Sequence, residues 1–324
     1  MKPARQGETG AALLTVLLLV AVIGALAAVS LEKLKIATRL ATNMAATDQA
    51  RAFGFAAESL ATLRIADLVA RDRERTTLDG DWQGQPIAFP IDGGTAIALL
   101  SDGGNCFNLN SVVIGQAQTG LAARPSAIGQ FAALMRLLDI RGEDASRIAV
   151  ALADWIDSDS DPQPGGAEDG AYQGYRTANT LVADPSELRA VAGVSAAIYA
   201  RLRPWICALP DTDLSPLNVN TLRPDQAPLI AMLLPGQLNL ARAKAIIDER
   251  PKAGYSNIVD FWKLPALVGQ TPPPDIYAQP QLKTRWFMVD LNIELAGAEL
   301  REIALIDGAL VPARLVYRSY GDPS

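Results

Sequence analysis

The sequence predicts an α+β protein in which a long N-terminal helix packs on an antiparallel sheet, with a large all-helical insertion of two helical subdomains interrupting that sheet. Three observations lead to this fold class. No proline occurs between Pro3 and Pro86, so one uninterrupted helix can form near the N-terminus. Short apolar runs separated by turn residues stand at both ends of the remaining chain. Between them, apolar residues recur at helical spacing.

Composition narrows the classes of function. The chain has 324 residues, 49% of them hydrophobic, which allows one large core or two to three smaller ones. A net charge of −6 disfavours binding to polyanions, so no nucleic-acid partner is expected. The sequence contains no histidine, which removes the commonest general base and metal ligand. We therefore expect no enzyme, and any bound metal must be held by oxygen atoms.

The N-terminal region predicts a membrane anchor. Residues 11–31 carry no charge up to Glu32, and about 20 apolar residues suffice for a helix to cross a bilayer. Lys2 and Arg5 precede this segment, so the positive-inside preference keeps the N-terminus cytoplasmic and sends the rest of the chain outward. The large C-terminal part is then extracytoplasmic.

The helix is expected to continue far beyond the membrane. The charged residues that follow the apolar segment fit a helix running from residue 11 to about residue 69, roughly 90 Å long. Its outer half carries apolar residues three to five positions apart, which predicts a face that packs on the sheet. The residues of this face are Phe53, Ala57, Leu60, Leu63 and Leu68.

The sheet is predicted from two groups of strands. Residues 86–90, 96–100 and 106–110 are apolar runs around an Asp92-Gly93-Gly94 turn. The other group stands near the C-terminus, with Asp307-Gly308 as a hairpin signal. Its strands are expected at residues 286–295, 299–306 and 310–317.

The insertion, about residues 111–279, contains a weak repeat. Residues 107–111 read Phe-Asn-Leu-Asn-Ser and residues 217–221 read Leu-Asn-Val-Asn-Thr, each before a helical stretch that its Ser or Thr can cap. The second copy continues through Leu234-Pro235-Gly236 and resembles a helix-hairpin-helix module, some of which bind DNA. Its usual second glycine is absent, since Gln237 follows Gly236, which favours structural packing.

The acidic segment from Asp154 to Asp169 is the clearest signal for a ligand-binding site in the sequence. Counted from Asp157, three further carboxylates fall at positions three, five and twelve, the spacing of an EF-hand loop, although Pro162 replaces the glycine at position six. A carboxylate-rich extracytoplasmic loop favours calcium. A solvated acidic loop and a catalytic carboxylate pair are the alternatives. The candidate ligands are Asp157, Asp159, Asp161, Glu168 and Asp169, with Asp154 a weaker one.

The two cysteines predict one disulfide. Cys106 and Cys207 are too few for a four-thiolate zinc site, but they can pair in an oxidising compartment. The predicted extracytoplasmic location of the C-terminal part supplies such a compartment.

The N-terminus resembles the type IV pilin family, with a basic leader that ends at Gly10 and an apolar helix that begins at Ala11. The resemblance implies cleavage after Gly10 by a prepilin peptidase and N-methylation of Ala11. Most pilins carry a glutamate at the fifth mature position, where this chain has Thr15. Since that carboxylate is thought to pair with a neighbouring subunit, its absence fits a subunit with no neighbour above it. An ordinary single-pass anchor is the alternative.

The combination of motifs resembles general secretion pathway protein K. It includes the leader, the missing glutamate, the two repeat copies, residues 153–172 and residues 259–262. This resemblance implies a minor pseudopilin that initiates or caps the tip of a type II secretion pseudopilus with the minor pseudopilins I and J. It also implies calcium in the acidic loop and a single-pass inner-membrane protein with a periplasmic head.

The predicted organisation follows from these segments. A membrane-anchored DNA receptor that uses the helix-hairpin-helix-like module is the alternative function. The expected parts are a cleaved leader at 1–10, a transmembrane part at 11–31, the pilin-like helix and first strands at 32–110, the insertion at 111–279 and the last strands at 280–324.

Overall fold

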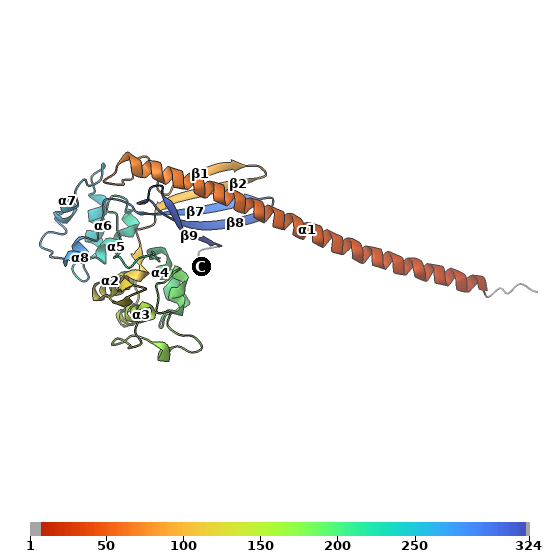
Figure 1. The fold of residues 1–324 in the computed structure, drawn as a ribbon, viewed down its shortest axis with the longest axis horizontal. Helices are drawn as coiled ribbons and strands as arrows, with labels where there is room; N and C mark the ends of the chain where they lie inside the picture. Colours follow the sequence, from red (N-terminus) through yellow and green to blue (C-terminus); the bar gives the residue numbers. More distant parts are fainter. Residues whose placement is uncertain (1–7, 322–324) are drawn as a thin grey trace, which may run out of the picture.

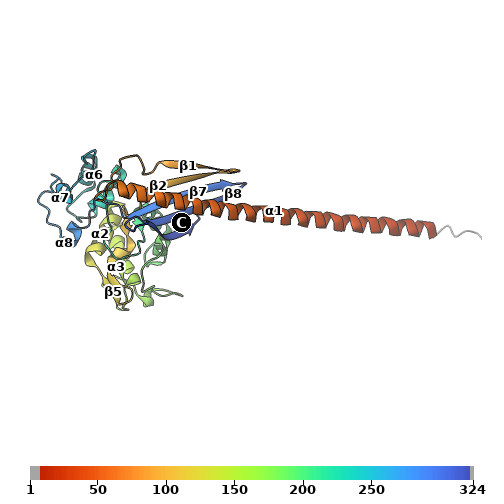
Figure 2. The ribbon, with the colours of Figure 1, turned by 45° about the horizontal axis from the view of Figure 1, so that its top comes forward.

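The computed structural model describes residues 8–321. Its helix α1 runs from Glu8–Arg71, roughly 95 Å at 1.5 Å per residue, which confirms the long N-terminal helix. The first half of α1 projects far from the head (Figures 1 and 2). By length and composition α1 could cross a membrane, and none of its most apolar window is buried in the protein. The first seven residues of the predicted leader, including Lys2 and Arg5, lie outside the described residues.

A five-stranded antiparallel sheet carries the outer half of α1. The strand order is β1-β2-β7-β8-β9, so β2 and β7 are hydrogen-bonded neighbours although the whole insertion separates them in sequence. The prediction that both groups of strands form one sheet is therefore confirmed. The strands are β1 (Pro86–Ile91), β2 (Gly94–Asp102), β7 (Trp286–Leu295), β8 (Ala298–Asp307) and β9 (Arg314–Tyr320).

Two strand predictions need correction. The last strand begins at Arg314 rather than at residue 310, because the chain first turns through residues 308–313, where Pro312 has no N–H for a ladder. Residues 106–110 do not join the large sheet. Within them, β3 (Phe107–Asn108) pairs in parallel with β6 (Ile206–Cys207), and the next residues form the short 3-10 helix η1 (Leu109–Val112).

The face of α1 that contacts the sheet differs from the predicted stripe. Ala57 is buried, and Phe53 and Leu68 pack against the sheet core, but Leu60 and Leu63 are exposed. The most buried contacts are made instead by small residues and one isoleucine, because small side chains let the helix lie close to the strands. These residues are Ala46, Ala50, Ala57 and Ile65.

The insertion is mostly helical, but the description of it as all-helical is wrong. It contains the β3–β6 pair and a hairpin of β4 (Val113–Gln116) and β5 (Gly120–Ala123). One continuous hydrophobic cluster runs through both predicted subdomains, from Phe107 to Ile276. Its helices are α2 (Pro125–Leu137), α3 (Gly142–Ile156), η2 (Asp169–Ala171), η3 (Pro185–Ala190), α4 (Ala196–Leu202), η4 (Arg203–Trp205), η5 (Pro224–Gln226), α5 (Ala227–Ala231), α6 (Leu240–Asp248), α7 (Ile258–Trp262) and α8 (Pro274–Tyr277).

The sequence repeat is also a structural repeat. The Asn110 side chain donates to Val182 O at 2.9 Å and accepts from Val182 N at 2.8 Å. In the second copy, Asn220 makes the same pair of bonds to the main chain of Tyr255, at 3.0 and 2.6 Å. Each buried asparagine thus fastens the segment that follows its own copy.

The predicted capping by Ser111 and Thr221 is wrong. The Ser111 hydroxyl donates backward to Asn108 O, and the Thr221 hydroxyl donates to Asp102 Oδ2 at 2.6 Å. The side chains of Asn108 and Asn218 instead accept from the main-chain N–H two residues later, at 3.2 and 2.9 Å. An amide oxygen can reach that N–H within a tight turn, which explains why asparagine takes the capping place.

Candidate metal site

The acidic loop begins where α3 ends. Asp157 is the C-cap of α3, and the buried face of that helix holds the start of the loop against the insertion core. The loop returns at Glu168, just before η2. Both ends are therefore fixed, although the loop between them is exposed.

The structure brings three of the five predicted ligands together. One carboxylate oxygen from each of Asp157, Asp159 and Glu168 lies within 4.8 Å of the other two. Asp157 and Glu168 are buried, with 3% and 6% of their surfaces exposed, whereas Asp159 is exposed. The cluster therefore has a buried base and an open side.

The other two predicted ligands lie outside this cluster. Asp161 turns back, so that its N–H donates to Asp159 Oδ1 at 2.9 Å, and its own side chain is exposed. Asp169 accepts from the N–H and the hydroxyl of Thr177, at 3.0 and 2.9 Å. Direct coordination by these two carboxylates would require the loop to rearrange.

Burial and the repulsion of neighbouring carboxylates make Asp157 and Glu168 hard to ionise. Burial first, and then the charges of Asp159, Asp154 and Glu168, together raise the pKa of Asp157 to about 7. Burial is also the main cause of the raised pKa of Glu168. An added cation would relieve this repulsion.

Two buried oxygen atoms in the cluster have no hydrogen-bond partner among residues 8–321. These atoms are Asp157 Oδ1 and Glu168 Oε1. Buried polar atoms nearly always have a hydrogen-bond partner, so two unpaired carboxylate oxygens indicate a place for a bound ion or water. Oxygen-only ligands with open geometry suit calcium, and the carboxylates of this cluster fit such an ion.

Asp154 holds the acidic loop in place by accepting hydrogen bonds from two of its residues. Its Oδ2 accepts from Ala167 N at 2.8 Å, and its Oδ1 accepts from the side chain of Gln163 at 3.1 Å. A Cβ on Gly166 would lie 1.8 Å from Asp154 Oδ2, so only glycine fits there. Sequence reasoning missed Gly166, although the adjacent Gly165 and Gly166 in an acidic loop were a usable signal.

The two cysteines form the predicted disulfide. Cys106 and Cys207 are bonded, with 5.8 Å between their Cα atoms and a sequence separation of 101. Cys106 follows β2 of the large sheet, and Cys207 belongs to β6 of the insertion. The bond therefore ties the sheet to the insertion, beside the buried side chains of Trp286 and Leu305.

The hairpin-like module serves packing. Leu233, Leu234 and Leu238 around the Pro235-Gly236 turn are buried in the insertion core. Arg250, which a phosphate-binding surface could have used, donates instead to Leu222 O at 2.7 Å and Val219 O at 3.2 Å. This geometry gives no support to the alternative of a DNA receptor.

A long apolar helix whose outer half lies on an antiparallel sheet, with a helical insertion between the strands, defines a pilin-like protein. Family models for protein K of the type II secretion system match residues 105–211 and 217–284. Together with the relatives below, these matches show that the chain belongs to the family of type II secretion system protein K. Proteins of this family are structural components of a secretion machine.

Similar proteins extend over nearly the whole chain. The chain is 32% identical to type II secretion system protein K of Pectobacterium carotovorum subsp. carotovorum over 326 residues, covering 98% of each protein. It is 34% identical to the protein of the same name from Aeromonas hydrophila over 311 residues, covering 92% of each. A chain of the solved GspK-GspI-GspJ complex from enterotoxigenic Escherichia coli matches with TM-score 0.73 and 28% identity, covering 85% of this chain and 96% of that one.

Proposed function

We propose that this protein sits at the tip of the type II secretion pseudopilus, where it initiates or caps the filament. The observation that carries the proposal is Thr15, the fifth residue after Gly10, which has no carboxylate to offer a neighbour. Its hydroxyl instead donates within α1, to Ala12 O at 2.9 Å. A carboxylate at membrane depth costs about 2.5–3.5 kcal/mol on insertion scales, so a subunit keeps one only where a partner compensates.

The expected partners are the minor pseudopilins I and J. The solved relative comes from a complex of GspK with GspI and GspJ, which supports a similar assembly here. In this proposal α1 anchors the protein in the inner membrane, and the head, with its disulfide, lies in the periplasm. A prepilin peptidase then acts on the cytoplasmic leader.

The position in the filament can be tested by counting subunits. Full-length protein co-expressed with I, J and the major pseudopilin should enter a complex with I and J and be present at about one copy per filament. In sheared filaments, quantitative mass spectrometry should show that Thr15→Glu raises its ratio to the major pseudopilin, because the added carboxylate permits packing within the filament. Thr15→Gln is the matched uncharged control. A wild-type ratio to the major pseudopilin that stays constant as filament length increases would contradict the tip position, because a tip subunit becomes a smaller fraction of a longer filament.

Processing after Gly10 is a separate prediction. Gly10 and Ala11 lie within the described part of α1, and the resemblance to pilins places the cleaved bond between them. Mass spectrometry of protein extracted from peptidase-positive cells should show a chain that begins at methylated Ala11. In peptidase-negative cells the N-terminal peptide should remain intact. An uncleaved terminus in both strains would refute processing.

We also propose that Asp157, Asp159 and Glu168 hold a structural calcium ion. The unpaired buried oxygens of Asp157 and Glu168 support it. Main-chain oxygens of the loop or water would complete the ligand shell. An ion that binds only the folded state adds stability of RT ln(1 + [L]/Kd), about 2.7 kcal/mol at a hundredfold excess over Kd.

Metal removal should therefore lower the melting temperature of the purified full-length protein in detergent. Terbium, which occupies calcium sites, should luminesce when tryptophan is excited, since Trp155 lies in the last turn of α3, two residues before Asp157. Asp157→Asn with Glu168→Gln should abolish the chelator effect, whereas Asp161→Asn should retain it. Unchanged melting on chelation, together with no terbium signal, would leave a solvated loop as the explanation.

A further inference from the structure

A buried carboxyl group lies where α1 crosses the large sheet. Glu302 of β8 has 2% of its side chain exposed, and its Oε2 has no hydrogen-bond partner among residues 8–321. A Cβ added at Gly54 of α1 would lie 2.9 Å from this oxygen, so the carboxyl group sits directly against the main chain of the helix. Neither the proposed calcium site nor the proposed tip position uses Glu302.

One arginine serves two carboxyl groups at this place. Arg318 of β9 donates from both Nε and Nη2 to Glu58 Oε2 on α1, with Nε at 2.9 Å. Its guanidinium also lies 4.6 Å from the centre of the Phe55 ring, which fixes its position beside the helix. Glu302 Oε1 lies farther from the same Nε, at 3.4 Å. The donors of Arg318 thus satisfy Glu58 and leave Glu302 weakly paired.

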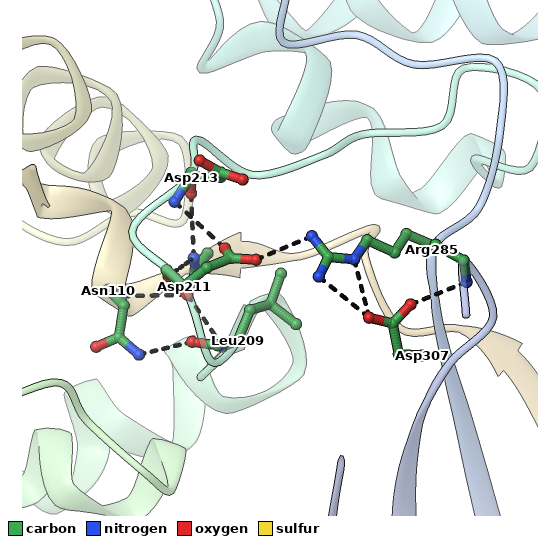
Figure 3. A network of polar contacts seen from close by, with 8 residues as sticks. Asn110, Leu209, Asp211, Asp213, Arg285 and Asp307 are labelled. Carbon is green, nitrogen blue, oxygen red and sulfur yellow. Dashed lines mark hydrogen bonds and ion pairs between the residues drawn. The ribbon is translucent and has the colours of Figure 1, made fainter. Parts of the chain in front are cut away.

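A second arginine, Arg285, also bridges two carboxylates and provides a comparison. It pairs with Asp211 at 3.3 Å and with Asp307 at 3.1 Å (Figure 3). Main-chain N–H groups supply the remaining donors, so all four carboxylate oxygens accept a hydrogen bond. The Arg285 side chain is also 44% exposed, against 23% for Arg318. Glu302 differs because it is buried with one oxygen that has no donor.

The surroundings of Glu302 favour its neutral form. Burial raises the pKa of Glu302 most, Arg318 lowers it, and the charge of Glu58 raises it, with a net increase. Tyr320 stands opposite Glu302 in the β8–β9 ladder and is 47% exposed. Within the described chain, the titratable groups that face Glu302 are therefore Glu58 on α1 and Arg318 and Tyr320 on β9. The β7 neighbours on this face are apolar and buried, namely Val289, Leu291 and Ile293.

We infer that Glu302, Glu58 and Arg318 form a proton-dependent latch that holds the outer half of α1 on the sheet. While Glu302 keeps its proton, a neutral carboxyl group lies against α1, and Arg318 binds Glu58 across the interface. Loss of that proton leaves two negative charges on one arginine, and one buried charged oxygen then faces the helix without a donor. The outer half of α1 should therefore separate from β8 and β9 more often as the pH rises. This inference rests on neither the calcium proposal nor the position in the filament.

The test is hydrogen exchange of the full-length protein in detergent micelles, with labelling times corrected for the intrinsic effect of pH on exchange. From about pH 5 to about pH 8, the opening constant of residues 46–62 should rise, by up to about tenfold per pH unit above the pKa of Glu302. In Glu302→Gln, which keeps the size of the side chain without its charge, this rise should disappear. Asp102 and Asp157 also have raised pKa values, but both are present in the two proteins, so the difference isolates Glu302.

Two further variants test the other contacts of the latch. Glu58→Gln removes the charge that opposes ionisation and frees Arg318 to pair with Glu302, so the rise with pH should become smaller. Gly54→Ala places a methyl group against Glu302 Oε2 and should loosen α1 at every pH, although alanine is the better helix former.

Parallel pH profiles of wild type and Glu302→Gln would overturn the inference. If Glu302→Gln fails to fold, Glu58→Gln decides, because an undiminished rise in that variant contradicts the latch. A Gly54→Ala protein whose α1 opens no more often than in wild type would show that Glu302 does not control how the helix is seated.

Discussion

Replacing both Cys106 and Cys207 by alanine is expected to lower the free energy of unfolding by roughly 4–5 kcal/mol. The disulfide closes a loop of 101 residues, and the entropy of such a loop in the unfolded chain sets this magnitude. Few other parts of the fold can replace it, because the parallel β3–β6 pair beside it has only two residues in each strand. The contacts between the sheet and the insertion should be the first to weaken when the disulfide is removed.

Urea unfolding of the full-length protein in detergent, followed by tryptophan fluorescence, measures this effect. Trp286 packs in the same cluster as the two cysteines and reports on that joint. Wild-type protein treated with a reductant is the control, and it should unfold at the same urea concentration as the double alanine variant. If wild-type protein unfolds at the same urea concentration with and without reductant, the disulfide contributes little to stability.

Replacing Asp102 by leucine is the second change expected to have a large effect. Asp102 ends β2 and is 8% exposed. Its Oδ2 accepts from the hydroxyls of Thr221, at 2.6 Å, and Thr284, while its Oδ1 accepts from Gly104 N at 2.9 Å. One carboxylate thus joins the sheet, the second repeat copy and the segment before β7. Leucine would leave these buried donors without an acceptor, at a cost of roughly 3–5 kcal/mol.

Asp102→Asn is the matched variant, because an amide keeps the shape and the threonine hydroxyls can turn to accept from it. Comparing this variant with wild type also isolates the effect of the Asp102 charge on stability. Burial raises the pKa of Asp102 to about 6, so the folded state holds this proton more tightly than the unfolded state does. The contribution of Asp102 to the free energy of unfolding should therefore rise as pH falls from above 6 to about 4, by up to about 3 kcal/mol.

The measurement compares urea unfolding of wild-type protein and both variants from about pH 4 to about pH 8. The difference in unfolding free energy between wild type and Asp102→Asn should favour wild type increasingly as the solution becomes acidic. Asp102→Leu should be less stable than both at every pH. A wild-type profile parallel to that of Asp102→Asn would show that the buried group does not titrate in this range.

The long helix and the sheet could be predicted because their signals are local and repeated. An uninterrupted apolar helix needs only its own sequence, and β7 begins and ends where its apolar run does. The contact face of α1 could not be predicted in this way. Hydrophobicity favoured Leu60 and Leu63, but close approach to the strands favours alanine, a preference that exists only once the sheet is in place.

The candidate site shows the same division between local and distant determinants. Carboxylate spacing identified the loop and the three residues that converge, Asp157, Asp159 and Glu168. It also placed Asp161 at position five, but that side chain is exposed and lies outside the cluster. Asp169 was a further candidate, and a sequence pattern does not reveal that Thr177, beyond the loop, donates to its carboxylate. The β3–β6 pair was missed for a related reason. Each of its strands has two residues, about a hundred positions apart in sequence, and two residues carry no periodic signal.

The prolines of β1 have a consequence for how neighbouring molecules can meet. β1 and β9 are the two edges of the large sheet. Pro86 and Pro90 lie on the same side of the β1 ladder as Ala88, and proline is tolerated in an edge strand where its missing N–H faces outward. Of these three residues only Ala88 keeps a donor for an incoming strand. Sheets of adjacent molecules therefore cannot fuse along β1, and sideways growth into a continuous ribbon is blocked at that edge.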